Sequence, residues 1–107
     1  MRYLMMSIDN GTEPDAALYA EMGKFIEEMT AAGILLATGG LEPGGTRITS
    51  VGDEFTVVDG PFAEAKEEVG GFALVEVRSK DEAIEMARRF RRIVGDGVSV
   101  IHQVFGP

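Results

Sequence analysis

The sequence predicts an α+β fold of the ferredoxin-like class, a sheet with two helices on one face and an inserted β-hairpin. The first observation behind this prediction is the order of the expected elements: strand, helix, strand, hairpin, strand, helix, strand. The second is that right-handed crossovers leave few other topologies for such an order. The third is that the 107 residues contain no repeat, linker or low-complexity segment, so residues 1–107 are expected to form a single domain.

The first strand is expected over residues 2–8, where both alternating sets of side chains are apolar. A strand that is apolar on both faces has to be covered on both. The polar tripeptide at residues 9–11 then ends this strand. The helix that follows, expected over residues 15–32, has Thr12 as its predicted N-cap and Gly33 as its stop. Its apolar stripe consists of Leu18, Met22, Phe25, Ile26 and Met29.

The middle of the chain is expected to hold a strand and then a hairpin. Residues 34–41 form the strand, in which Gly39-Gly40 indicates a bulge or a close approach of two backbones. After a loop at residues 42–45, the segments 46–50 and 54–58 are expected to pair around a compact turn.

The last part of the chain repeats the strand–helix–strand pattern. Gly70-Gly71 is expected to let the chain fold back sharply into the sheet, and residues 72–77 form a strand that is apolar on both faces. Ser79 and Glu82 form a capping box for the next helix, which ends at Gly95. The last strand covers residues 98–105, with Val98, Val100, His102 and Val104 on one face.

The two helices cover only one face of the predicted sheet, yet three of its strands are apolar on both faces. The uncovered face therefore needs a partner, and the same sheet of a second subunit is the simplest one. We expect a homodimer.

Charge and composition argue against several functions. The net charge of −8 argues against a nucleic-acid-binding surface, which needs an excess of Lys and Arg. Four of the ten basic residues cluster, but they close a helix, where cations complement the helix dipole. We favour this interpretation over an anion-binding patch. The four residues are Arg88, Arg89, Arg91 and Arg92.

No cofactor or metal is expected. The chain has no cysteine and a single histidine, His102, which argues against a disulfide framework, a thiolate site and a multi-histidine site within one chain. The longest apolar runs, such as residues 34–37, are far shorter than the roughly 18 residues that span a bilayer. With no signal-peptide core at its start, the chain is expected in the cytoplasm.

The stretch at residues 57–72, VVDGPFAEAKEEVGGF, concentrates Gly, Pro and charge in one loop. Pro61 fits the first position of a short helix whose free amides point back toward Asp59. Asp59 has two interpretations: a turn former that caps this helix, or a carboxylate held beside a cleft for general acid or base work. Phe62 is interpreted as a hydrophobic plug or as a wall of that cleft.

Other candidate site residues lie behind this stretch or elsewhere in the chain. Glu64 and Lys66 belong to a charged turn typical of a solvated face, although Lys66 is also a candidate for binding an anion. Glu42, on the loop after the second strand, is a candidate to face the same cleft as Asp59. For His102, the one histidine of the sequence, we favour a structural over a catalytic role.

At Asp59-Gly60-Pro61-Phe62, followed by Ala63-Glu64-Ala65-Lys66-Glu67, the chain resembles the DGPF-domain proteins of the YCII-related family. The resemblance covers nearly the full length. It includes Gly40-Leu41-Glu42-Pro43, Gly70-Gly71-Phe72, Ser79-Lys80-Asp81-Glu82-Ala83 and Gln103-Val104-Phe105.

The resemblance implies a dimeric α+β barrel among cytoplasmic bacterial proteins, most of which have no assigned activity. Some are encoded beside extracytoplasmic-function sigma factors, which implies a regulatory role. A distant branch includes a dehydrochlorinase with a proposed His–Asp pair, whose histidine lies in the first helix. Residues 15–32 here contain no histidine, so that chemistry is not carried over. Relatives often have His at the position of Glu42 and a Pro-containing loop where this chain has residues 88–97.

We therefore expect a small-molecule-binding domain with a cleft between sheet and helices, and the sequence leaves open whether it is an enzyme. In the acid–base hypothesis Asp59 is the acid or base, with His102 a weaker candidate. The alternative is a regulatory or protein-interaction module, for example a partner of a sigma factor. In a third interpretation the protein is a dimer whose central motif serves only to shape the fold. The expected ligand-binding residues are Glu42, Pro61, Phe62, Glu64 and Lys66.

Overall fold

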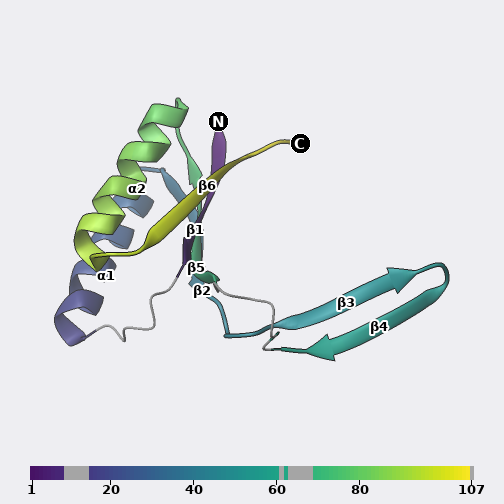
Figure 1. The fold of residues 1–107 in the computed structure, drawn as a ribbon. Coiled ribbons are helices and arrows are strands. Elements are labelled where there is room, and N and C mark those ends of the chain that lie inside the picture. The colour runs from purple at the N-terminus through teal and green to yellow at the C-terminus, as the bar shows by residue number, and fades with distance from the viewer. Residues whose placement is uncertain (9–14, 61, 63–68, 107) are drawn as a thin grey trace.

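The computed structural model describes residues 1–8, 15–60, 62 and 69–106. Its body is an antiparallel four-stranded sheet in the order β2-β5-β1-β6, with both helices on one side (Figure 1). This arrangement confirms the predicted ferredoxin-like class. The elements are β1 (Arg2–Ile8), α1 (Ala16–Ala31), β2 (Leu35–Gly40), β3 (Thr46–Val51), β4 (Glu54–Asp59), β5 (Val69–Glu76), α2 (Lys80–Val94) and β6 (Val98–Val104).

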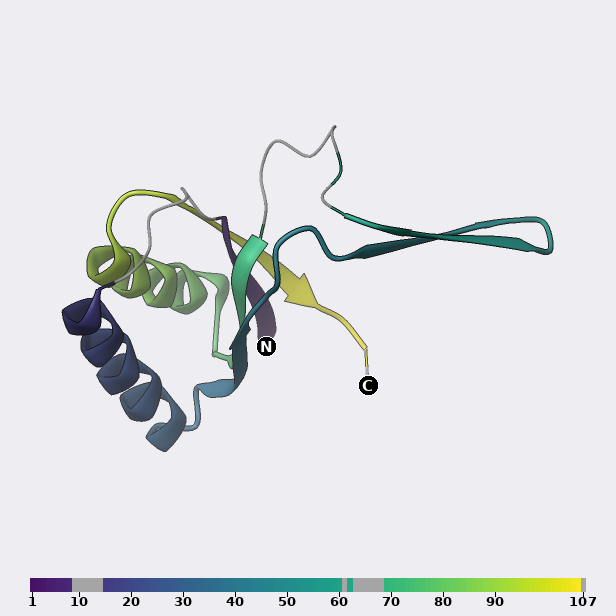
Figure 2. The ribbon, with the colours of Figure 1, turned by 90° about the horizontal axis from the view of Figure 1, so that it is seen from below.

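The strand register assigns each side chain of the sheet to one of two faces. Met5 of β1 lies opposite Ala73 of β5 and Ile101 of β6, and these three residues pack against the buried core under the helices. Directly opposed residues share a face, so the alternate residues point the other way. We call that side the open face, because neither of the described helices covers it (Figure 2). It carries Leu4, Leu74, Val100, His102 and Val104.

The start of α1 differs from the prediction. The helix begins at Ala16, and Asp15 is its N-cap, with a carboxylate oxygen that accepts a hydrogen bond of 2.8 Å from the Leu18 amide. The predicted cap, Thr12, is too far upstream of this start, and it lies outside the described residues. The end of the helix is as predicted, because Gly33 has a positive φ of 75° directly after the C-cap.

The capping box of α2 is confirmed. The Ser79 hydroxyl accepts a hydrogen bond from the Glu82 amide, and the Glu82 carboxylate accepts one from the Arg78 amide, both at 3.2 Å. Two cations, Arg91 and Arg92, lie in the last turn before Gly95. This matches the predicted helix-closing role for part of the arginine cluster. None of the described helices is long and apolar enough to cross a membrane.

The prediction that Gly70-Gly71 turns the chain sharply back into the sheet is wrong. Strand β5 begins at Val69, so both glycines lie within it. Gly71 pairs with Gly40 of β2, and a Cβ on Gly71 would lie 3.2 Å from the Gly39 carbonyl oxygen. The glycines therefore serve a close approach of two strands, which is one of the two interpretations given for Gly39-Gly40.

Strands β3 and β4 form a separate two-stranded sheet, which we call the arm (residues 46–59). In both ribbon views the arm extends away from the body on the side of the sheet opposite the helices (Figures 1 and 2). Every residue of its two strands is exposed. The inserted hairpin is therefore a projection rather than part of the main sheet.

Candidate functional site

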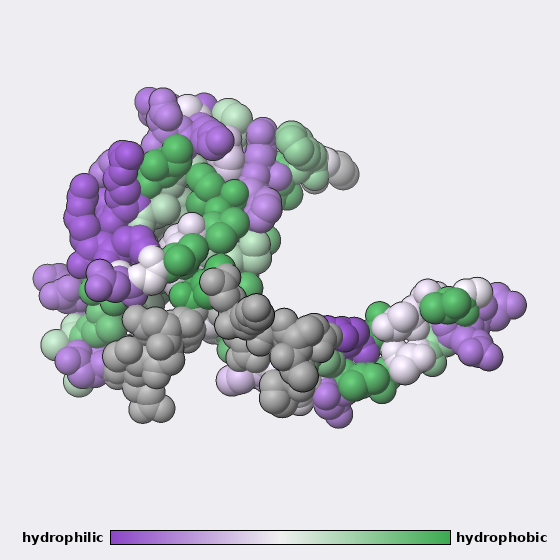
Figure 3. All heavy atoms as spheres, viewed as in Figure 1, coloured by the Kyte–Doolittle hydropathy of each residue, from purple (hydrophilic) through white to green (hydrophobic). Residues whose placement is uncertain are grey.

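An apolar cavity of about 120 Å³ lies between the sheet and the two helices. The sheet and both helices contribute to its walls. The lining includes Met5, Ala73 and Val75 on the sheet, Phe25 and Met29 on α1, and Met86 and Phe90 on α2. Figure 3 shows hydrophobic surface gathered in the middle of the body, with the more polar surface of the helices to its left. The predicted cleft between sheet and helices thus has a physical counterpart.

Two serine hydroxyls give this cavity a polar end. Ser7 of β1 and Ser99 of β6 lie directly opposite each other and both line the cavity. The Ser7 hydroxyl accepts a hydrogen bond of 3.2 Å from the Arg91 guanidinium. The Ser99 hydroxyl is buried and has no hydrogen-bond partner in the described part of the chain. A buried hydroxyl without a hydrogen-bond partner lowers the stability of the fold by roughly 1–3 kcal/mol. A ligand group that forms a hydrogen bond with this hydroxyl would remove that cost.

Arg91 is positioned by its surroundings on α2 and the loop before β6. Its guanidinium carbon lies 5.1 Å from the centre of the Phe90 ring, and a Cβ on Gly97 would collide with the guanidinium. Gly97 therefore leaves the space that this side chain fills. A second, more open depression includes Ser99, Arg91 and Gly97 in its lining, which places the arginine beside the polar end of the first cavity.

A third hydroxyl, Thr38, also lines the cavity. It donates a hydrogen bond of 2.8 Å to the Phe72 carbonyl oxygen, so its hydrogen is already in use. Polar chemistry in the cavity therefore concentrates at Ser7 and Ser99.

The described residues of the DGPF motif fasten the base of the arm. Asp59 accepts a hydrogen bond of 2.8 Å from the Thr46 hydroxyl across the hairpin. The Gly60 amide donates to the Gly45 carbonyl at 2.8 Å. The ring of Phe62 lies under the Arg47 guanidinium, 3.9 Å from its carbon to the ring centre. These contacts give the motif a structural function at this point of the chain.

A model of the YCII-related domain matches residues 1–105 of this chain. The chain belongs to the YCII-related family. A curated relative, an uncharacterized protein of Rhizobium meliloti (strain 1021), is 54% identical over 35 residues. That match covers 33% of this YCII-family chain and 28% of the relative's length.

Among solved structures, the YCII-family protein is similar to 5-chloro-2-hydroxyhydroquinone dehydrochlorinase from Burkholderia phenoliruptrix AC1100, in its complex with 2,5-dihydroxybenzoquinone. The similarity covers 100% of this chain and 96% of the dehydrochlorinase chain, with a TM-score of 0.60 and 17% identity. At this identity it shows a shared fold.

The predicted site residues of this YCII-family protein do not meet in one place. Asp59 lies in the arm, whereas His102 is exposed on the open face of the main sheet, opposite Leu4. Glu42 is exposed on the loop between β2 and the arm. None of these three is in the lining of either cavity. Three other candidates, Pro61, Glu64 and Lys66, lie outside the described residues.

The sequence prediction did not include the serines at the polar end of the cavity. Of the central stretch, the described residues that line the cavity are Gly71 and Phe72. The available signal was the presence of Ser7 and Ser99 within strands that are otherwise largely apolar. A polar residue in such a strand indicates a hydrogen-bonding need on a packed face.

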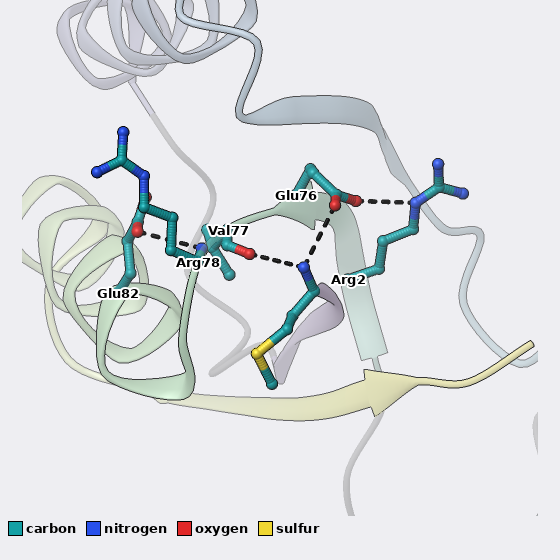
Figure 4. A network of polar contacts seen from close by, with 6 residues as sticks. Arg2, Glu76, Val77, Arg78 and Glu82 are labelled. Carbon is teal, nitrogen blue, oxygen red and sulfur yellow. Dashed lines mark hydrogen bonds and ion pairs between the residues drawn. The ribbon is translucent and has the colours of Figure 1, made fainter.

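A separate polar network lies where β1 begins and β5 ends (Figure 4). The Glu76 carboxylate accepts a hydrogen bond of 2.9 Å from the Arg2 guanidinium and one of 3.3 Å from the amine of Met1. The Arg2 hydrogen bond and then the amine hold the pKa of Glu76 below its usual value of 4.5. None of these three residues lines the cavity, so the network serves the sheet rather than the site.

Proposed function

We propose that this YCII-family protein binds a small molecule in the cavity between the sheet and the helices. The observation that carries the proposal is the buried Ser99 hydroxyl, which lacks a partner among the described residues at one end of an otherwise apolar cavity. A ligand with an apolar body and one polar group satisfies both parts of this surface. A ligand group that pairs with Ser99 would lie near Ser7 and Arg91, because Ser7 is opposite Ser99 and its hydroxyl accepts a hydrogen bond from Arg91.

The size of the cavity supports a ligand with a single ring. An apolar cavity of about 150 Å³ is known to hold benzene, and this one measures about 120 Å³. The structurally similar dehydrochlorinase was solved with 2,5-dihydroxybenzoquinone, which is also a one-ring molecule. We therefore infer that the ligand class comprises small rings with a hydroxyl or oxo substituent.

Calorimetric titration with phenol and with benzene tests this proposal. We expect phenol to bind more tightly than benzene, and Ser99→Ala to reduce phenol affinity by about three- to tenfold, as for one lost hydrogen bond. Ala73→Leu fills the cavity and should abolish binding of both. The matched control, His102→Ala, changes an exposed residue on the open face and should bind like the wild type. Phenol binding that survives Ala73→Leu unchanged would contradict the proposed location.

Acid–base catalysis remains a prediction. Asp59 is the candidate acid or base because Thr46 holds its carboxylate in place, and His102 is the second candidate. If either residue is catalytic, turnover of a phenolic or quinone substrate should disappear in Asp59→Asn or His102→Gln while phenol binding is retained. Identical turnover in the wild type and both variants would remove these assignments.

We also propose a homodimer formed through the open face. Its support is that the apolar residues Leu4, Leu74 and Val100 share a face of the sheet that neither described helix covers. Val104 lies on this face and is 42% exposed, so Val104→Lys should leave the subunit folded but shift it toward monomer in sedimentation equilibrium. A dimer of unchanged stability would contradict this interface.

A protein partner such as a sigma factor is the competing occupant of the same face. A wild-type chain that sediments as a monomer and co-purifies with one stoichiometric protein would favour that function. Location in the cytoplasm likewise remains a prediction.

A further inference from the structure

The arm has an apolar middle and charged ends. Ile48 lies opposite Val57, and Phe55 lies on the same face opposite Ser50. Ile48 is 68%, Phe55 72% and Val57 64% exposed. The charged residues lie at the two ends: Arg47 and Asp59 at the base, and Asp53 and Glu54 at the tip. An apolar centre with a polar rim is the usual anatomy of a protein interface.

This hairpin has no support along its length from the described part of its own chain. A lone two-stranded hairpin is marginally stable at best in water. The arm is nevertheless fastened at its base by the Thr46–Asp59 hydrogen bond, the Gly60–Gly45 hydrogen bond and the stacking of Arg47 on Phe62. These contacts close the hairpin at its base, but they leave its apolar middle uncovered and therefore available to a partner.

The direction in which the arm extends favours a second copy of this chain as its partner. The arm extends from the body on the side of the open face, away from the helices (Figures 1 and 2). A second sheet placed against the open face would therefore lie beside the arm. In a two-fold dimer each subunit offers the same surfaces to the other, so both arms would be covered at once.

We propose that the arm clasps a second copy of this chain, packing Ile48, Phe55 and Val57 against the partner beside its open face. The inference rests on the proposed homodimer and adds the element that holds it together. Because the interface would then continue from the sheet onto the arm, the open face alone would supply only part of the dimer's stability.

Deletion of residues 46–59 tests the clasp directly. The Gly60 amide already lies 2.8 Å from the Gly45 carbonyl oxygen, so Gly45 joins to Gly60 with little rearrangement of the body. We expect the dimer dissociation constant from sedimentation equilibrium to rise by about tenfold or more. An unchanged dissociation constant would overturn the clasp while leaving the sheet interface standing. A wild-type monomer would overturn both proposals.

Point variants test the clasp even if the deletion variant fails to fold. The double variant Phe55→Ser, Val57→Thr changes only exposed side chains and should weaken the dimer with no loss of subunit secondary structure. Its control, Asp53→Asn at the tip, should dimerise like the wild type. Equal dissociation constants for the double variant and this control would count against the clasp.

Photo-crosslinking identifies the surface that the arm contacts. Phe55 is replaced by benzoylphenylalanine in ¹⁴N- and in ¹⁵N-labelled chains, and the two purified preparations are mixed. Crosslinks between subunits then give mixed-isotope peptides. We expect such mixed peptides to map to the main sheet of the second copy. Crosslinks confined to single-isotope peptides would overturn the clasp.

Discussion

At Gly60 the backbone leaves no room for a side chain. A Cβ there would lie 2.5 Å from the carbonyl oxygen of Gly44 and 2.9 Å from its Cα. Both atoms belong to backbone, so they cannot move aside as the end of a flexible side chain would. The close contact between the chain segments that enter and leave the arm therefore explains why the DGPF motif has a glycine at this position.

Gly60→Ala should destabilise the protein by about 1–3 kcal/mol, because the added methyl overpacks the base of the arm. Urea unfolding followed by circular dichroism measures this free energy. Gly23→Ala is the matched control, since Gly23 lies in the middle of α1 with nothing within 4 Å of a Cβ. That change should stabilise the protein by about 1 kcal/mol. Equal effects at the two positions would contradict the packing argument.

Glu76 makes the stability of the sheet end depend on pH. Its pKa in the folded protein is lowered, first by the Arg2 hydrogen bond and then by the amine of Met1. A lowered pKa means that the carboxylate stabilises the fold fully above the usual value of 4.5 and loses this contribution as the pH falls through the folded-state pKa. A carbon-detected NMR titration should give a midpoint below 4.5 for Glu76. Arg2→Gln should move that midpoint back up, and no movement would refute the cause.

At the scale of single elements, the helix ends are governed by local side chains. Asp15 caps α1 and Ser79 caps α2, each through one hydrogen bond to an amide three residues on. Such short-range contacts are visible in sequence, which is why the capping box of α2 was predicted correctly. The cap of α1 was assigned to Thr12 because several candidate caps precede that helix. Asp15, directly before the first helical residue, is the one that the helix uses.

Ser79→Ala should cost about 1 kcal/mol, the usual effect of losing an N-cap. Thermal unfolding of the variant beside the wild type measures this loss. Ser79→Asp retains an acceptor at the cap and should restore most of the stability. A Ser79→Asp variant as unstable as Ser79→Ala would show that the cap is not the cause.

The strands show where sequence patterns reach their limit. Runs of apolar residues predicted the strands of the body, but the pairing of Ser7 with Ser99 joins opposite ends of the chain. No local pattern encodes that pairing, and so the cavity's polar end was not predicted. Gly70-Gly71 was misinterpreted for the same reason, because its role depends on Gly39-Gly40 across the sheet.

At the scale of the whole molecule, two layers and an arm leave much apolar surface to be covered. Among the described residues, only five apolar side chains are buried: Tyr3, Met29, Val75, Val77 and Ala83. The helices cover one face of the sheet and enclose the cavity, while the open face and the arm remain available for association. The homodimer was inferred from the two-sided strands alone, and it stays a prediction.

We propose that the cavity, rather than the DGPF loop, binds a small ring. A ¹H–¹⁵N NMR titration with phenol tests it most directly, because every described amide reports on its own surroundings. We expect saturable shifts centred on Ser7, Ser99 and Phe90, and we expect them to be absent in Ala73→Leu. Shifts confined to Asp59 and His102, or no shift as phenol approaches its solubility limit, would contradict it.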